Sequence, residues 1–233
     1  MVTPIPEDSI KRLWITAGHG ELWGSKGTYG FVEYRRLPTL PPIRSNFDWL
    51  SALPKRDYNS TLDSPENKVE SFPSIETGLQ SLGFQVPQEL KMLITWPEIQ
   101  VQIPTCTDCY LELSDAVTPL PGYPDSYVVR FMNDSQCCVM WYLLFQRNKP
   151  VRVLASVYFI EKDIFDAMQY EVGEDGDLLR YEGVLADSCI CAESLGEFLF
   201  RFCIENAIWI ATHNNQELSP LETDYMMQAR GSA

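Results

Sequence analysis

The sequence predicts an α+β protein in which helices pack on a central, largely antiparallel sheet. Two helical segments come first, a run of strand-like segments follows, and one more helix closes the series. This order is typical of α+β folds, whereas a doubly wound parallel sheet needs regular alternation of strand and helix. Of the 233 residues 45% are hydrophobic, so the chain can bury a substantial core.

Residues 1–72 read as an N-terminal extension rich in strands and loops. Between residues 14 and 34 glycines alternate with aromatic side chains, which favours short strands and turns. Residues 46–53 predict a short helix, and residues 55–71 form a polar stretch that we interpret as a linker. The expected organisation is therefore the extension (1–72), an α+β core (73–212) and a C-terminal tail (213–233).

Two helices open the core. Residues 74–82 place apolar side chains on one helix face, and Gly83 is suited to end that helix. A second helix is expected to begin at Pro87 and to stop before Pro97. The apolar positions of the two helices are Ile75, Leu79, Leu82, Leu90, Leu93 and Ile94.

Three strands should follow, at residues 127–131, 137–145 and 151–159, because these segments are rich in Val, Tyr, Phe and Trp. Residues 146–150 read as a hairpin connection, so the last two strands should pair antiparallel. Their aromatic side chains, from Trp141 to Phe159, are more often sheet core than the wall of a ligand groove.

A long helix should begin at Ser194, because Ser194 and Glu197 have the spacing of a capping box. In that motif each side chain accepts a hydrogen bond from the other residue's free backbone N–H. The following apolar residues have helical spacing and should pack on the sheet: Leu195, Phe198, Leu199, Phe202 and Cys203.

The formal net charge is −14, from 18 basic and 32 acidic residues. This sign argues against a protein that neutralises nucleic-acid phosphates or binds anionic membranes. Residues 1–100 hold 10 basic and 12 acidic side chains, so most of the excess lies in the second half. Residues 161–187, here called the acidic segment, hold nine acids against Lys162 and Arg180.

Five carboxylates of the acidic segment are the candidate partner-binding residues: Glu171, Glu174, Asp175, Asp177 and Glu182. They match a calcium-binding EF-hand loop only in part, because position 3 is Gly173 and no EF helices flank the loop. A solvated acidic loop is the preferred interpretation. The acidity serves either to attract a basic protein or to maintain solubility alone.

The N-terminus shows no basic, apolar signal sequence, and the longest apolar segments are far shorter than the roughly 20 residues that span a bilayer. We therefore expect a cytoplasmic protein without a membrane contact. Seven cysteines in such a protein should be reduced thiols.

Cys106 and Cys109 form a C-x-x-C pair, which can share a metal or form a redox disulfide. A four-cysteine zinc site would add Cys189 and Cys191, although their spacing is shorter than usual. Buried structural thiols are the favoured interpretation. Cys137 and Cys138 are neighbours in a predicted strand, so their side chains should point to opposite faces.

The two histidines do not complete a catalytic pattern. His19 lies between two glycines, which suits an exposed loop, and His213 follows the last helix, where it would be a capping or surface residue. No phosphate-binding glycine motif is present. We therefore predict no catalytic residue and no cofactor.

Four segments resemble the SUKH superfamily: residues 82–93, residues 127–134, the strand pair that ends at Phe159, and residues 194–199. They match its proline-led first helix, its strand that ends in Asn or Asp, and its final S-x-x-E-F-L helix. The resemblance covers about residues 75–209. The sequence Thr95-Trp96-Pro97 departs from the N-G turn that the family usually has after its first helix.

The resemblance implies a non-enzymatic α+β module that binds a protein. Bacterial members of the superfamily resemble immunity proteins that neutralise a toxin domain, and eukaryotic members resemble cell-wall or signalling regulators. An acidic surface could attract a basic toxin domain. The alternative function is a metal-binding or thiol-redox protein that uses Cys106 and Cys109.

Overall fold

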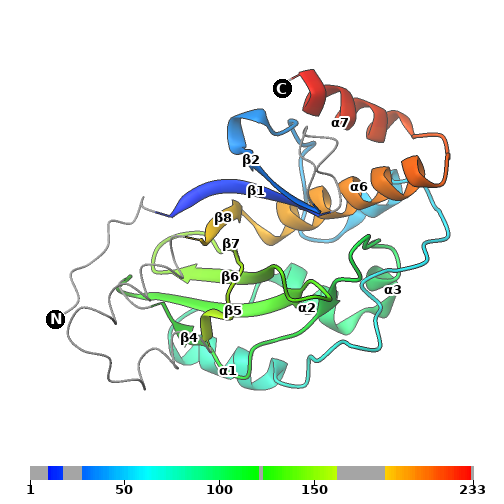
Figure 1. Ribbon diagram of the computed structural model, residues 1–233. Coiled ribbons are helices and arrows are strands. Elements are labelled where there is room, and N and C mark those ends of the chain that lie inside the picture. Colours follow the sequence, from blue (N-terminus) through cyan, green and yellow to red (C-terminus); the bar gives the residue numbers. More distant parts are fainter. Residues whose placement is uncertain (1–9, 18–27, 121–122, 162–186, 232–233) are drawn as a thin grey trace.

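The computed structural model describes residues 10–17, 28–120, 123–161 and 187–231 (Figure 1). Within these residues the chain forms a mixed sheet of eight strands and five α-helices, which confirms the predicted α+β fold. The strands are β1 (Lys11–Ala17), β2 (Tyr29–Glu33), β3 (Tyr110–Leu111), β4 (Thr118–Pro119), β5 (Ser126–Asn133), β6 (Met140–Gln146), β7 (Arg152–Ser156) and β8 (Cys189–Ala192). The helices are α1 (Phe72–Ser81), α2 (Gln88–Thr95), α3 (Pro97–Gln100), α6 (Leu195–His213) and α7 (Pro220–Gly231).

The strands lie in the order β2-β1-β8-β7-β6-β5-β3, and β4 also pairs with β5. The short strands expected near the N-terminus are present as β1 and β2. Among the described strands, the pairing of β1 with β8 is the one parallel contact, so the sheet is largely antiparallel as predicted. Lys11 in β1 pairs with Cys189 in β8, which joins the N-terminal hairpin to the centre of the sheet, and β2 occupies one end.

The predicted hairpin of β6 and β7 is confirmed, with Met140 opposite Ser156 and Leu144 opposite Arg152. Both strands are shorter than predicted. All seven residues of β6 are buried, so each face of the sheet is covered.

One face of the sheet packs against α1, α2 and α6 through a single hydrophobic core. Figure 1 shows α1 and α2 together on one side, and α6 alongside β8 with α7 against it. The core contains an aromatic cluster in which the rings of neighbouring residues lie 5.6 to 6.1 Å apart: Trp14, Phe131, Trp141, Phe198 and Phe202. The opposite face carries a smaller core that includes Tyr142, Leu144, Leu154 and Ile190.

The helix boundaries follow the local signals in the sequence. Gly83, with φ +81°, ends α1 because its left-handed conformation lets the N–H of Phe84 donate to the carbonyl of Leu79 at 2.9 Å. Pro87 precedes α2 directly, and Pro97 begins the short helix α3, which the sequence pattern did not predict. Residues 46–53 form a 3-10 helix, η4 (Asp48–Ala52), and another, η3 (Tyr34–Arg36), follows β2.

Ser194 caps α6, because its hydroxyl accepts from the N–H of Glu197 at 3.1 Å. The Glu197 carboxylate accepts instead from the N–H of Glu193, at 3.0 Å, one residue earlier than the expected capping box. Helix α6 has 19 residues and ends at His213, and no helix among the described residues is long and apolar enough to cross a bilayer. The helix α7 was not predicted.

The polar stretch of residues 55–71 contacts the folded core. Leu62 is fully buried, and its N–H donates to the carbonyl of Ile103 at 3.0 Å. Arg56 forms a buried ion pair with Glu222 of α7, in which Nη2 lies 2.8 Å from Oε2.

Candidate functional site

The four cysteines considered for a metal site lie in two places. Cys106 and Cys109 belong to the loop before β3, whereas Cys189 and Cys191 lie in β8. All four cysteines are in the reduced, non-disulfide form. Among the described residues no group of three or more His, Cys, Asp or Glu side chains is arranged to hold a metal ion.

Burial also sets the chemistry of these thiols. Burial raises the pKa of Cys106 and of Cys189 to about 12, and it also raises the pKa of Cys109 and of Cys191 well above the ordinary value of a thiol. Thiolate is the nucleophile in disulfide exchange and the ligand in metal sites, so these positions are poor in the reactive form near neutral pH.

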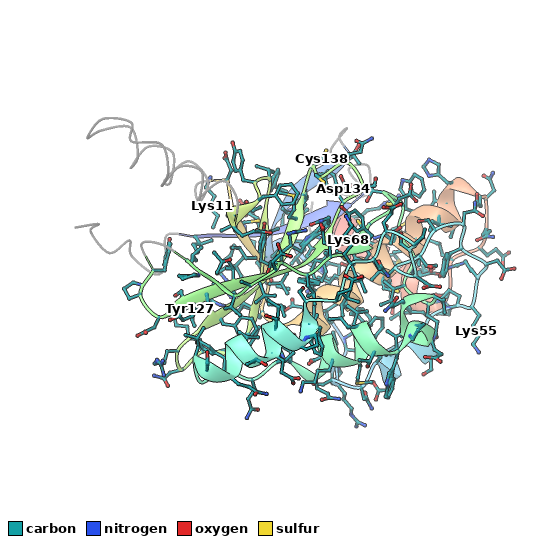
Figure 2. The ribbon with its side chains drawn as sticks, turned by 90° about the horizontal axis from the view of Figure 1, so that it is seen from below. Lys11, Lys55, Lys68, Tyr127, Asp134 and Cys138 are labelled. Carbon is teal, nitrogen blue, oxygen red and sulfur yellow. The ribbon has the colours of Figure 1, made fainter. Side chains whose placement is uncertain are left out.

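Cys137 and Cys138 do not lie in a strand, so the prediction that they face opposite sides of the sheet is wrong. They lie in the turn between β5 and β6, where Cys137 has φ +55° and Cys138 is exposed. Asp134 holds this turn, because its Oδ2 accepts from the N–H groups of Gln136 and Cys138 at 3.1 Å each. Figure 2 shows Asp134 and Cys138 at the same end of the structure. The hydrophobic pattern predicted a strand here because it does not show that the Asp134 side chain binds the backbone N–H groups that a strand would use for pairing.

The structure places His213 at the exposed end of α6, where its ring stacks on Trp209 at 3.9 Å between centroids. His19 lies outside the described residues. The five candidate partner-binding carboxylates, Glu171, Glu174, Asp175, Asp177 and Glu182, also lie outside them.

The two ends of the acidic segment are described, and they are held at the sheet. Its first residue, Glu161, accepts from Arg130 Nε at 2.6 Å and from the Tyr142 hydroxyl at 2.8 Å. Its last residue, Asp187, directly precedes Ser188 and β8 and accepts from the Tyr158 hydroxyl at 3.5 Å. The sheet therefore fixes where the acidic segment leaves and returns.

Arg130 is the centre of this attachment. Its guanidinium is 4% exposed, and it forms ion pairs with Glu161 and with Glu112. The ring of Phe159 lies 5.0 Å from the guanidinium carbon, which adds a cation–π contact. Burial by itself raises the pKa of Glu112, but the hydrogen bond and charge of Arg130 outweigh burial, so the pKa of Glu112 lies below its ordinary value of 4.5. The Glu112 carboxylate is thus held in its ionised form.

An apolar hollow lies beside the place where the acidic segment returns to the sheet. The hollow, about 360 Å³ in volume, is lined by Leu13, Phe31, Val157 and Cys189, with Lys11 and Asp187 as its charged groups. We call it the Phe31 hollow. Lys11, one of its lining residues, is labelled in Figure 2. Its lining comes from β1, β2, β8 and the segment that follows β7.

Large apolar side chains are unusually exposed around the Phe31 hollow. Phe31 is 58% exposed, Val157 is 37% exposed, and the adjacent Tyr158 is 39% exposed. Exposed apolar residues that gather at one place, unlike single ones, mark interaction sites. Trp141, Tyr142 and Phe145 are fully buried, as the sheet-core interpretation predicted, but that interpretation is wrong for Tyr158, which lies beyond the end of β7 and is exposed.

A larger groove, about 820 Å³, lies between α1, α2 and the connection of β6 to β7. Its lining is mostly polar and includes five glutamate or glutamine side chains, and Lys91 is already paired with Glu76. Polar atoms make up most of the exposed surface of this groove, whereas apolar atoms make up most of that of the Phe31 hollow. We therefore take the Phe31 hollow and the two ends of the acidic segment as the candidate site.

The sequence pattern identified the acidic segment but missed Phe31 and Val157. Phe31 belongs to the glycine- and aromatic-rich extension. The alternation of side chains along a strand does not show which of its faces is left uncovered by other elements. Comparison of the chain with models of protein families, with curated proteins and with solved structures found no match.

Proposed function

We propose that this protein is a non-enzymatic protein-binding module and that its partner is a basic protein domain. The proposal rests on one juxtaposition. The acidic segment leaves the sheet at Glu161, four residues after Val157, and returns at Asp187, which itself lines the Phe31 hollow. The exposed apolar surface therefore lies beside Asp187, the residue at which the acidic segment ends in the sequence.

Exposed apolar side chains surrounded by charged residues are typical of protein–protein interfaces. Exposed aromatic side chains at the centre supply most of the binding energy, because their burial removes apolar surface from water. Charges around such a centre attract a partner of opposite sign and raise its association rate. Nine acids against two bases in the acidic segment favour a basic partner.

The resemblance to the SUKH superfamily supports the same proposal from the sequence. Immunity-type members of that superfamily bind a toxin domain, and a basic nuclease-like toxin would match the charge of the acidic segment. Under this proposal the protein covers the basic substrate-binding surface of such a toxin and so neutralises it. A cell-wall or signalling partner with a basic surface would use the same contact.

The experiment is affinity capture from the cells that encode the chain. The full chain is immobilised as wild type, as Phe31→Asp and as Met227→Asp. Met227 is 64% exposed on α7, so Met227→Asp adds the same charge away from the Phe31 hollow. We expect one basic protein in stoichiometric amount with wild type and Met227→Asp, and about tenfold less with Phe31→Asp.

Two results would contradict the proposal: no protein captured in stoichiometric amount, or equal capture by all three baits. If the captured protein is a toxin, the purified pair also allows a direct assay. Wild type and Met227→Asp should abolish the toxin's activity at equimolar ratio, and Phe31→Asp should need an excess.

A further inference from the structure

Helix α7 lies outside the sheet, and buried polar contacts hold it to the rest of the described structure. The Arg56 guanidinium forms an ion pair with Glu222, and the Tyr225 hydroxyl donates to Glu205 Oε1 at 2.8 Å. Glu205, Glu222 and Tyr225 are each at most 4% exposed. Figure 1 shows α7 beside α6, at the opposite end of the molecule from α1. The docking of α7 therefore depends on specific polar partners.

A helix that occupies the α7 position must supply the same polar groups. Arg56 requires a carboxylate, because a buried guanidinium that loses its ion-pair partner is strongly unfavourable. Glu205 accepts the hydrogen bond from Tyr225, and the N–H of Thr39 donates to Gln228 Oε1 at 3.0 Å. The required helix has a glutamate, a tyrosine three residues later and an amide after three more. A second copy of this chain carries that helix.

The connection between α6 and α7, residues 214–219, reverses the chain at Asn215. Asn215 has φ +53°, which is left-handed, and its N–H donates to the carbonyl of Thr212 at 3.3 Å. The N–H of Gln216 donates to the carbonyl of Ala211 at 2.8 Å. These two hydrogen bonds form a Schellman motif, which ends a helix and turns the chain. Asn215 has the one positive φ in this connection, so rotation of this residue would direct α7 away from α6.

We infer that two copies of this chain exchange α7, so that the α7 of each copy docks on the α6 of the other. In the exchanged dimer, Arg56 of one copy pairs with Glu222 of the other, and the contacts are those of the monomer. The described part of α7 pairs with no strand, so the exchange leaves the sheet intact. The hinge at Asn215 and the protein concentration then set the balance of the two forms. This inference is independent of the proposed function.

The hinge is tested with Asn215→Ala and Asn215→Gly in the full chain, refolded from urea. Glycine adopts the left-handed conformation freely and alanine does not, so Asn215→Ala should favour the open hinge and Asn215→Gly the closed one. Sedimentation velocity over about a hundredfold range of protein concentration gives the dimer dissociation constant. We expect a value at least about tenfold lower for Asn215→Ala than for Asn215→Gly. The control is Asn214→Ala, at φ −89°, which should stay within about twofold of wild type.

Exchange between copies is tested by mixing Arg56→Met with Glu222→Gln. When α7 docks within one chain, each substitution leaves one buried charge without its ion-pair partner. In the mixed, exchanged dimer one contact has the wild-type ion pair, and the other joins two neutral side chains, so no buried charge is left unpaired. The two variants are unfolded in urea, mixed and refolded together.

Native mass spectrometry separates the three possible dimers by mass. We expect the heterodimer to be at least about tenfold more abundant than the two homodimers together. The mixture should also unfold at a higher urea concentration than either variant alone. The control mixture combines Glu222→Gln with Arg147→Met, at an exposed arginine, and should give dimers in statistical ratio.

Three outcomes would overturn the exchange of α7. Wild type and Asn215→Ala could stay monomeric over the whole concentration range, or Asn215→Ala and Asn215→Gly could have equal dissociation constants. Dimers of Arg56→Met and Glu222→Gln in statistical ratio would show association through another surface. If neither of these two variants folds alone, a folded heterodimer from the mixture supports exchange directly, and without one the comparison of Asn215→Ala with Asn215→Gly decides.

Discussion

Arg130 Nε lies 2.6 Å from Glu161 Oε1, so a buried guanidinium holds the first carboxylate of the acidic segment against the sheet. Arg130 also pairs with Glu112. Without Arg130, the two largely buried carboxylates would lose the cation that they share, although Glu112 would keep Lys68 and Glu161 would keep the Tyr142 hydroxyl. We expect Arg130→Met to lower the free energy of unfolding by about 3–5 kcal/mol, measured by urea denaturation. Arg147→Met, at an exposed arginine, should change it by less than about 1 kcal/mol. Equal effects of the two substitutions would contradict the anchoring role.

The ion pair of Arg56 with Glu222 predicts how stability depends on pH. Burial by itself raises the pKa of Glu222, but hydrogen bonds from Arg56 and Ser219 outweigh it, so the pKa lies below its ordinary value of 4.5 in the folded protein. A carboxyl with a lowered pKa in the folded state stabilises the fold above its unfolded pKa, and this contribution is lost as the pH falls through the folded pKa. The free energy of unfolding of the wild type, measured with urea, should therefore fall as the pH is lowered below 4.5. Glu222→Gln should lose less stability over the same range, and an unchanged pH profile would contradict this assignment.

The hydroxyl of Tyr225 donates to Glu205 Oε1 at 2.8 Å and so fixes α7 to α6. Glu205 is 1% exposed and also accepts from the indole N–H of Trp14 at 2.9 Å. Tyr225→Phe removes one donor from a buried carboxylate, so we expect a loss of about 1–3 kcal/mol in the free energy of unfolding. Tyr158→Phe removes a hydroxyl from a partly exposed ring and should change it by less than about 1 kcal/mol. A neutral Tyr225→Phe substitution would show that the hydrogen bond does not hold α7.

The cysteines should differ sharply in reactivity toward a thiol reagent in the folded protein. Cys138 is exposed and should react first, although slight burial and the neighbouring Asp134 carboxylate raise its pKa and slow the reaction at neutral pH. The buried thiols should react only after unfolding, because burial raises their pKa and blocks access. Cys138→Ser should remove the fast phase, and Cys189→Ser should leave it unchanged.

The same protein sample tests the metal alternative. Zinc bound at one atom per chain, lost in a Cys106→Ser/Cys109→Ser double variant, would contradict the assignment of these residues as structural thiols. Elemental analysis of the purified protein gives the result directly, and we expect no stoichiometric zinc.

The sequence predicted those elements whose signals are local. The periodicity of residues 74–82 and the serine at position 194 depend on neighbours within one or two turns, and both helices are present. The hairpin of β6 and β7 was equally predictable, because its connection is short. Local sequence signals could not predict that Lys11 pairs with Cys189, because the two residues lie 178 positions apart in the chain.

The candidate site was only half predictable for the same reason. A run of acids is visible in composition, so the acidic segment was found. The exposure of Phe31 and Val157 depends on which strand ends the sheet and on what lies beside it, and no local pattern carries that information. Arg130 was missed because an arginine within a buried strand gives no sign of its distant partners, Glu112 and Glu161.

The most direct test of the proposed function is the association rate constant of the captured partner, measured by stopped flow as salt is raised from about 50 to about 300 mM. Wild type is compared with a variant in which Glu171, Glu174, Asp175, Asp177 and Glu182 are replaced by their amides. We predict that the wild-type rate constant falls at least about tenfold over this range, and that the amide variant is slower at low salt and nearly independent of salt. A rate constant that is independent of salt and equal for the two proteins would contradict it and would leave the acidic segment with solubility as its role.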